Sequence, residues 1–299
     1  MGKIKILIYS NCHGGRLHQM FGTHPLTKDR FTVSYISNYI ELKNETLSQD
    51  HYELISECDF FIYQPFNKTY ENTEYDINRI RLHLKPRCII FRINYYRFKG
   101  FWYESNVKPY TEHGYYKFLD GPTDFGLHDS FSDGENMSLS DVREKIDGIK
   151  LDELSFATYF QDELYKLKGL DAKSDVKMYD FFLENYQTVL LFHDCFHPNS
   201  RFFYEVFRQT IDKLFQISLP LTDETFIGGI DELTTWAQPI LPVIKKRLCM
   251  TAIPDKFYWF DTCYETKILL LDVYDYYYIR LSPDNLDEYI LSQQKIVFN

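Results

Sequence analysis

The stretch that decides the fold is KIKILIY, residues 3–9, followed at once by SNCHGG, residues 10–15. The first part is a short β-rich run, and the second leads through two glycines into a helix-like segment, Arg16–Phe21. Three similar apolar runs follow along the chain: Phe31–Ile36, Asp59–Tyr63 and Cys88–Ile93. The segment Tyr75–Leu84, between the last two of them, is helix-like. Strands joined by long helical connections run parallel, so the sequence predicts an α/β fold with a doubly wound, mostly parallel sheet flanked by helices.

The second half of the chain continues the alternation less regularly. Residues 120–138 are rich in glycine and acidic residues and predict a loop insertion. Leu154, Phe160 and Leu167 lie on one face of a predicted helix, and we expect this helix to end at Gly169. Thr188–Phe192 is a further strand candidate, and a helix follows over residues 203–214. We expect an α/β catalytic domain over residues 1–218 and a mixed C-terminal extension, residues 219–299, packed on its core.

Composition excludes several classes of protein. The chain has 299 residues, 44% of them hydrophobic and 25% charged, which is typical of a globular protein rather than a disordered or fibrous one. The formal net charge of −10 argues against a nucleic-acid partner and against electrostatic docking on an anionic membrane. Aromatic residues make up 18%, which indicates ordinary packing or an aromatic-lined cleft or subunit interface.

The cysteines indicate a reducing compartment. The six cysteines are widely spaced and form no CxxC pair. The N-terminal apolar run is too short for a secretory signal, and no apolar stretch is long enough for a transmembrane helix. We therefore expect a cytoplasmic protein with reduced thiols, and a homo-oligomer is compatible with the sequence.

Cys12 is the first candidate for chemistry. It lies where the first predicted strand passes into a helix, and ligands of open α/β sheets bind at such carboxyl ends of strands. The N–H groups and the dipole at a helix N-terminus favour a thiolate. Gly14 and Gly15 would let a ligand approach the backbone closely. The alternative is a small residue in a structural turn.

Asp194 and His197 are the second candidate. An aspartate three residues before a histidine can accept a hydrogen bond from one ring nitrogen, so that the other nitrogen can deprotonate a nucleophile. Pro198 fixes the backbone directly after the histidine. A metal site using His193 and His197 is an alternative, although that spacing needs a helix and this stretch is predicted as loop. A purely structural turn is the other alternative.

Together the two motifs resemble those of SGNH-type (GDSL) hydrolases. Ser10-Asn11-Cys12 stands where that superfamily has Gly-Asp-Ser, and Asp194–Pro198 matches its last block. The cysteine makes the chain more similar to the WcbI-type polysaccharide-biosynthesis proteins, a family assigned as acetyltransferases that bind coenzyme A. Their first strand ends in an Asn-Cys motif, and the resemblance continues through the end of the Asp59–Gln64 run and covers roughly residues 3–215.

The resemblance implies an enzyme that transfers an acyl group, acetyl first of all, from acyl-coenzyme A to a sugar hydroxyl of a surface or capsule polysaccharide precursor. Cys12, His197 and Asp194 would be catalytic, with no metal. Asn11, Gln64 and Asn38 are candidates for binding the oxyanion or the substrate, and for Gln64 and Asn38 a plain surface or loop amide is the alternative. Gly14, Gly15, Arg16 and Arg201 are candidates for binding coenzyme A, and for the two arginines a solvated surface position is the alternative. His13, although adjacent to Cys12, is not assigned as the base.

Two mechanisms and two other functions stay open. His197 would either deprotonate Cys12, which then carries the acyl group, or activate the acceptor hydroxyl directly while Cys12 lines the site. An acyl hydrolase or thioesterase would use the same residues with water as acceptor. A non-catalytic protein that binds coenzyme A or a glycan would use them for binding alone.

Overall fold

The computed structural model describes residues 2–38, 47–65, 76–101, 138–148, 153–230, 239–260, 268–281 and 289. The chain forms two compact units that are interleaved along the sequence. Unit 1 comprises Met1–Tyr96, Lys166–Phe181 and Ser200–Asp231, and unit 2 comprises Arg97–Tyr165, Phe182–Asn199 and Glu232–Asn299. The division into domains at residue 218 stays a prediction.

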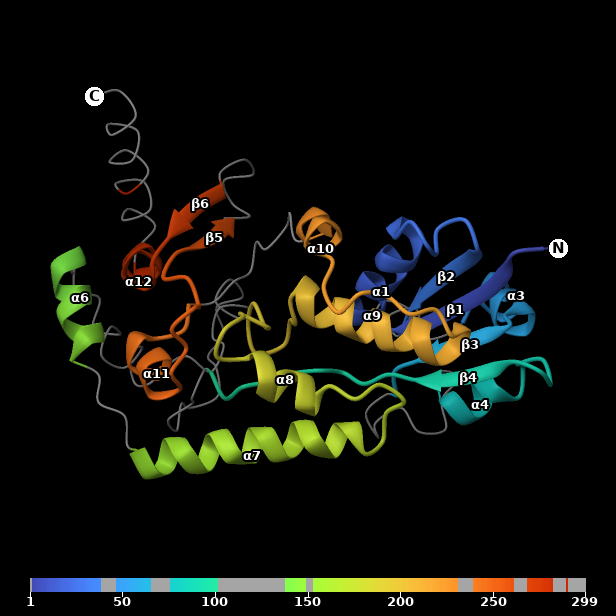
Figure 1. The fold of residues 1–299 in the computed structure, drawn as a ribbon, viewed down its shortest axis with the longest axis horizontal. Coiled ribbons are helices and arrows are strands. Elements are labelled where there is room, and N and C mark those ends of the chain that lie inside the picture. Colours follow the sequence, from blue (N-terminus) through green and yellow to red (C-terminus); the bar gives the residue numbers. More distant parts are fainter. Residues whose placement is uncertain are drawn as a thin grey trace, which may run out of the picture. The chain divides into compact units, whose positions relative to one another are not determined.

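Unit 1 is built on a parallel sheet. Among the described residues, the sheet has four strands in the order β2-β1-β3-β4, every neighbouring pair parallel. The strands are β1 (Ile4–Ser10), β2 (Phe31–Ser37), β3 (Phe60–Tyr63) and β4 (Ile89–Arg92). They confirm the four N-terminal strands expected from the sequence (Figure 1). The chain leaves β1 toward β2 on one side and returns to β3 on the other, so the strand order reverses at β1.

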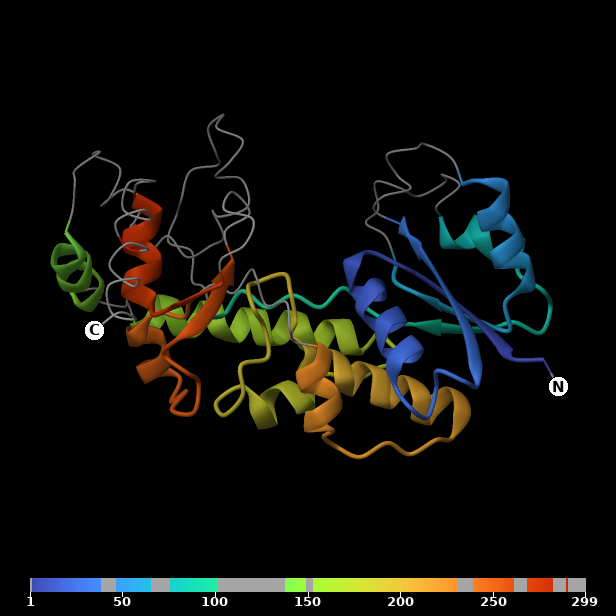
Figure 2. The same cartoon turned by 90° about the horizontal axis from the view of Figure 1, so that it is seen from above.

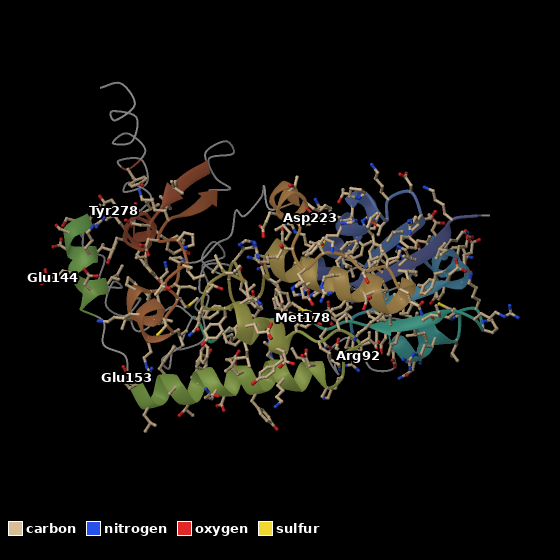
Figure 3. All side chains as sticks on the ribbon, viewed as in Figure 1. Arg92, Glu144, Glu153, Met178, Asp223 and Tyr278 are labelled. Atoms are coloured by element: carbon tan, nitrogen blue, oxygen red, sulfur yellow. The ribbon has the colours of Figure 1, made fainter. Side chains whose placement is uncertain are left out.

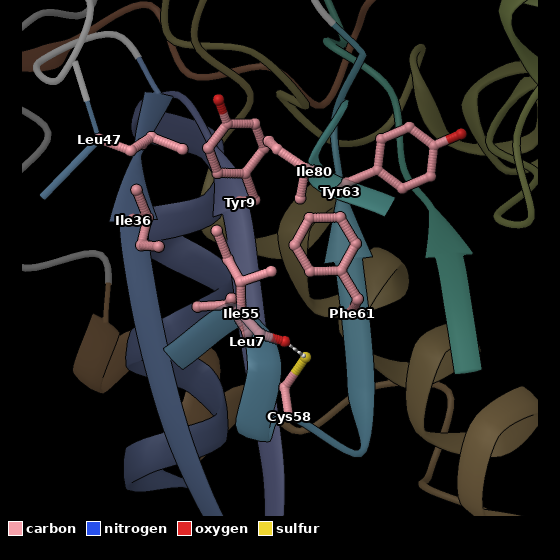
Figure 4. Packing of buried hydrophobic residues seen from close by; sticks show 9 residues of the cluster. All are labelled: Leu7, Tyr9, Ile36, Leu47, Ile55, Cys58, Phe61, Tyr63 and Ile80. Carbon is pink, nitrogen blue, oxygen red and sulfur yellow. Dashed lines mark hydrogen bonds between the residues drawn. The ribbon is translucent and has the colours of Figure 1, made fainter. Parts of the chain in front are cut away.

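Two helices cover one face of the sheet. Ile55 of α3 (Gln49–Glu57) and Ile80 of α4 (Ile77–Arg81) are buried against Leu7 and Phe61 of the strands (Figure 4). The whole cluster comprises Leu7, Tyr9, Ile36, Leu47, Ile55, Cys58, Phe61, Tyr63 and Ile80. Helix α4 is shorter than the predicted Tyr75–Leu84 segment.

The other face packs on α1 (Cys12–Thr23) and α9 (Ser200–Phe215). Phe215 lies 4.4 Å from Phe31 and 4.7 Å from Phe60 between ring centroids, and Phe21 lies 5.1 Å from Phe207. Residues on this face alternate along β1 with those of the first cluster, as expected for a strand buried on both sides. Helices therefore flank the sheet, whereas the doubly wound topology and the SGNH-like arrangement stay predictions.

Helix α7 (Glu153–Asp171) corrects the predicted stop at Gly169. Phe160 and Leu167 are buried as expected, but Leu154 is exposed. Open space surrounds the position that a Cβ of Gly169 would occupy, so the glycine neither breaks nor crowds the helix. The helix ends instead at Asp171, whose carboxylate accepts the backbone N–H groups of Met178 and Tyr179 at the start of α8 (Tyr179–Asn185).

The predicted strand Thr188–Phe192 was wrong. The backbone N–H groups of Thr188 and Val189 both donate to the carbonyl of Asn185, so the chain leaves α8 in turns. Phe192 makes an isolated antiparallel bridge with Pro198. Its ring is fully buried, 6.2 Å from those of Phe98 and Phe182. The apolar run is therefore buried by aromatic packing rather than by strand pairing.

Unit 2 contains the described helices and strands for which the sequence predicted least. They are α6 (Leu139–Asp147), α11 (Pro242–Arg247), the antiparallel pair β5 (Phe257–Phe260) and β6 (Ile268–Leu271), and α12 (Val273–Leu281), seen from above in Figure 2. Stacked and edge-on rings of Phe98, Phe101, Phe160 and Phe182 fill part of its core, which accounts for some of the aromatic content. Residues 120–137 of the predicted loop lie outside the described residues.

No helix in the described parts of the chain combines the length and the apolar character that a membrane crossing requires.

Candidate functional site

Cys12 is exposed and is the first residue of α1, which begins four residues before the predicted segment at Arg16. The helix starts here because Asn11 caps it: the Asn11 side chain accepts the N–H of His13 at 3.0 Å. The Asn11 carbonyl also accepts the N–H of Gly14 at 2.9 Å and the hydroxyl of Tyr35 at 2.7 Å. The thiol therefore lies at the positive end of a well-capped helix, at the carboxyl end of β1.

Tyr35 lies close enough to Cys12 for their charges to interact. Burial raises the pKa of the Tyr35 phenol, a hydrogen bond with Ser37 lowers it, and a negative charge on Cys12 raises it further. The neutral phenol is therefore the form that holds the Asn11 carbonyl.

Gly14 and Gly15 differ in their surroundings. A Cβ on Gly14 would meet the Cβ of Ser10 at 2.5 Å, and Ile8 and Tyr35 at 3.0 Å. A Cβ on Gly15 would meet only the Tyr35 ring, at 3.6 Å or more. Gly14 is thus required for close packing of α1 on the sheet, which is a structural role beside its predicted contact with coenzyme A.

Gln64 lies where the strand order reverses. Its backbone N–H donates to the Tyr9 carbonyl at 3.0 Å, and its side-chain oxygen accepts the Ser10 hydroxyl at 2.7 Å. Both side chains are buried. Because the Gln64 oxygen accepts from Ser10, the amide nitrogen is the group of the Gln64 side chain that can donate a hydrogen bond. Ser10 was not among the predicted site residues, although it begins the Ser10-Asn11-Cys12 motif at the end of the first strand. Asn38, directly after β2, is buried at the same edge of the sheet.

Asp194 and His197 form the hydrogen-bonded pair that their spacing predicts. The ring Nδ1 of His197 lies 2.7 Å from Asp194 Oδ2, and Asp194 Oδ1 accepts the N–H groups of Phe196 and His197 at 2.7 and 2.9 Å. The Asp194 side chain is 11% exposed, whereas that of His197 is 44% exposed. With Nδ1–H directed at the carboxylate, the neutral ring carries its basic lone pair on Nε2.

Backbone hydrogen bonds join the two ends of the loop that carries Asp194 and His197. The His193 N–H donates to the His197 carbonyl at 2.8 Å, and the Asn199 N–H donates to Leu191 at 2.9 Å. The buried Cys195 accepts the N–H of Phe98 through its carbonyl at 3.0 Å. The pair therefore lies on a hydrogen-bonded turn, and the prediction that it follows a strand was wrong. Within the described residues, no three His, Cys, Asp or Glu side chains gather in a way that could hold a metal ion.

Protein groups contact His13, the neighbour of Cys12, and the two candidate arginines. His13 is buried, with its ring 4.7 Å from that of Tyr95 and 5.2 Å from that of Phe203. Arg16 donates to Gln19 at 3.0 Å, and Arg201 forms an ion pair with Glu224. Any phosphate bound by Arg201 would compete with that carboxylate.

Cys12, Asn11, Asn38 and Gln64 thus share one edge of the sheet in unit 1, and Asp194 and His197 share one turn in unit 2. A Cys12–His197 dyad stays a prediction.

An α/β unit with polar groups and a thiol at the carboxyl edge of a parallel sheet is the arrangement of a small-molecule enzyme or ligand-binding protein. The sequence matches the family described as polysaccharide biosynthesis enzyme WcbI over residues 5–215. The chain belongs to this family of polysaccharide biosynthesis enzymes.

A solved structure of WcbI, a polysaccharide biosynthesis enzyme, is similar to this chain with a TM-score of 0.54 and 15% sequence identity. The similarity covers 82% of this chain and 79% of the other. That structure is of the native protein without a disulfide bond between coenzyme A and one of its cysteines. No curated protein sequence matches the chain.

Proposed function

We propose that the protein transfers an acyl group, acetyl in the first instance, from acyl-coenzyme A to a sugar hydroxyl during polysaccharide biosynthesis. The observation that carries this proposal is the buried Asp194 carboxylate bound to Nδ1 of the half-exposed His197. Such a pair prepares Nε2 to take a proton from a thiol or a hydroxyl. Membership of the WcbI family supports the pathway, and the solved WcbI structure supports coenzyme A as the acyl carrier.

In the first route, His197 takes the proton of Cys12 and the thiolate attacks the acyl carbonyl. The bond between the acyl group and coenzyme A breaks, His197 gives its proton to the departing coenzyme A thiolate, and the acyl group is held as a thioester on Cys12. His197 then takes the proton of the sugar hydroxyl that attacks this thioester and returns it to the Cys12 sulfur as the ester is released. The N–H groups at the start of α1 and the amide of Gln64 are the donors proposed for the oxyanion. In the second route, His197 activates the sugar hydroxyl directly, and Cys12 only lines the site.

The pairing of Cys12 with His197 is part of the proposal, as the resemblance of both motifs to those of the family implies. Asn11 and Asn38 are proposed to bind substrate, and Arg16 and Arg201 with the backbone at Gly14 and Gly15 to bind coenzyme A. A cytoplasmic location is part of the same proposal.

The test is intact-protein mass spectrometry after a single turnover with acetyl-coenzyme A. An acetyl adduct that is lost in Cys12→Ala, but kept in Cys249→Ala, supports the covalent route, because Cys249 is also an exposed thiol. If no adduct forms but coenzyme A is released when a sugar acceptor is added, the direct route holds.

Release of coenzyme A at the same rate without any acceptor would instead make the protein a hydrolase. Binding of coenzyme A by calorimetry that survives both Cys12→Ala and His197→Ala, with no turnover by the unmodified protein, would make it a binding protein. Either outcome contradicts the transferase.

A further inference from the structure

Cys58 and Cys88 form a second thiol site, at the edge of the sheet opposite to Cys12. Cys58 directly follows α3 and precedes β3, and Cys88 directly precedes β4. Their sulfur atoms lie 3.6 Å apart, although the two residues are 30 positions apart in the sequence. The parallel pairing of Phe60 with Ile89 fixes the two strand starts side by side, so this proximity is built into the sheet.

The two thiols differ in access and in environment. Cys58 is 2% exposed, and its thiol also donates a hydrogen bond to the Ile55 carbonyl, 3.3 Å away. Figure 4 draws this hydrogen bond as a dashed line. Cys88 is only partly buried. Lys85 lies beside both, held by Asp59 at 2.6 Å and by the Glu57 carbonyl at 2.9 Å.

This environment favours a thiolate on Cys88. The hydrogen bond with Cys58, more than the charge of Lys85, lowers the pKa of Cys88, while burial opposes the shift. The hydrogen bond with Cys88, together with burial, raises the pKa of Cys58. The accessible sulfur is thus the one that is more readily ionised, and the buried one keeps its proton.

We propose that Cys88 and Cys58 are a modification site, at which a peroxide converts the two thiols into a reversible disulfide. The Cys88 thiolate attacks one peroxide oxygen, giving a sulfenic acid on Cys88 and releasing hydroxide. The sulfur of Cys58 then attacks the Cys88 sulfur, forming the S–S bond, and its proton leaves with the sulfenic oxygen as water. The two thiols lose two electrons and the peroxide gains them.

The geometry requires little movement. A disulfide needs about 2.05 Å between its sulfurs, so the two side chains must approach by roughly 1.5 Å. Cys88 is the attacking thiol and Cys58 the resolving one, because reactivity follows thiolate character and exposure. None of the groups proposed for acyl transfer takes part, so the inference does not depend on that function.

The test is peptide mapping of the full chain under non-reducing conditions, with Cys12→Ser as the background so that Cys12 cannot exchange with the pair. After reduction and removal of the reductant, a titration with hydrogen peroxide is expected to link the Cys58 and Cys88 peptides first. Dithiothreitol should restore both thiols. The site is disproved if both residues are still alkylated as thiols at a dose that oxidises the exposed Cys249.

Two further variants test the order of attack. Cys58→Ser should leave Cys88 as a sulfenic acid that dimedone captures, and Cys88→Ser should leave Cys58 reduced at the same dose. Capture of dimedone on Cys58 in Cys88→Ser, at a rate matching that of Cys88 in the other variant, would overturn the assigned roles. Should Cys58→Ser not fold, the mapping of the Cys12→Ser background and the Cys88→Ser variant still decide the matter.

Discussion

Asp194 holds His197 through both of its carboxylate oxygens. Oδ2 lies 2.7 Å from the ring Nδ1, and Oδ1 accepts the backbone N–H of the same histidine at 2.9 Å. One side chain therefore fixes both the position of the histidine in its turn and the tautomer of its ring. The two functions can be separated experimentally, because only the second needs a negatively charged acceptor.

Asp194→Asn is expected to keep the turn and to lose activity. The amide oxygen can still accept the two backbone N–H groups, but an amide nitrogen facing Nδ1 favours the tautomer with the proton on Nε2. By analogy with catalytic triads, kcat should fall by about 10²- to 10⁴-fold while Tm changes little. Asp194→Ala, which also removes the turn hydrogen bonds, should lower Tm clearly. Equal kcat for Asp194→Asn and the unmodified protein would show that His197 is not the base.

Gln64 provides a second prediction about the reaction. Gln64→Glu preserves size and the oxygen that accepts from Ser10, but replaces the donor with a second acceptor. If the amide stabilises an oxyanion, kcat should fall by about 10²-fold with KM nearly unchanged. Ser10→Ala, which frees the Gln64 side chain without removing it, should give a smaller loss. A rise of KM alone would place Gln64 in substrate binding instead.

Local patterns predicted the parts of the molecule whose partners are close in sequence. The Asp194–His197 pair is such a case, because its members are only three positions apart. The bond between Ser10 and Gln64 spans 54 positions and depends on which strands become neighbours, which no local pattern specifies. The strand expected at Thr188–Phe192 failed for a related reason, since an apolar run predicts burial but not a hydrogen-bonding partner.

The start of α1 shows a different limit of prediction from the sequence. Gly14 and Gly15 have low helix propensity and favoured a later start, at Arg16. The cap supplied by Asn11 outweighs the low helix propensity of the two glycines. The close packing of Gly14 against Ser10 also favours a helix that begins before residue 14. The capping residue was visible in the sequence, whereas the close approach of helix and strand was not.

Gly14→Ala and Gly15→Ala should therefore have opposite effects on stability. The new Cβ at residue 14 would lie 2.5 Å from that of Ser10, and relieving this overlap should cost about 1–3 kcal/mol. At residue 15 the Cβ would make ordinary contact with Tyr35, and the higher helix propensity of alanine should add up to about 1 kcal/mol. Urea unfolding of both variants measures the difference. Equal stabilities would contradict the packing role of Gly14.

The environment of His24 predicts how the free energy of unfolding depends on pH. It is buried, its Nδ1 accepts the N–H of Leu26 at 3.2 Å, and its Nε2 lies 4.0 Å from Asp223, which Figure 3 labels. Burial lowers its pKa from the usual 6.5, and the charge of Asp223 offsets only part of the shift. Below pH 6.5 the unfolded chain therefore binds a proton that folded His24 does not, so the free energy of unfolding should decrease as the pH falls from 6.5 toward the folded pKa.

Two variants isolate this contribution from those of other groups. Asp223→Asn keeps the hydrogen bond from the Phe226 N–H but removes the charge that favours protonated His24. The pKa of His24 should then fall further, and the loss of stability below pH 6.5 should extend to lower pH. His24→Gln removes the titrating group and should flatten the same part of the curve. Urea unfolding between pH 7.5 and about 5 measures all three proteins, since that range brackets the unperturbed histidine. A curve for His24→Gln that parallels the unmodified protein would assign the dependence to another histidine.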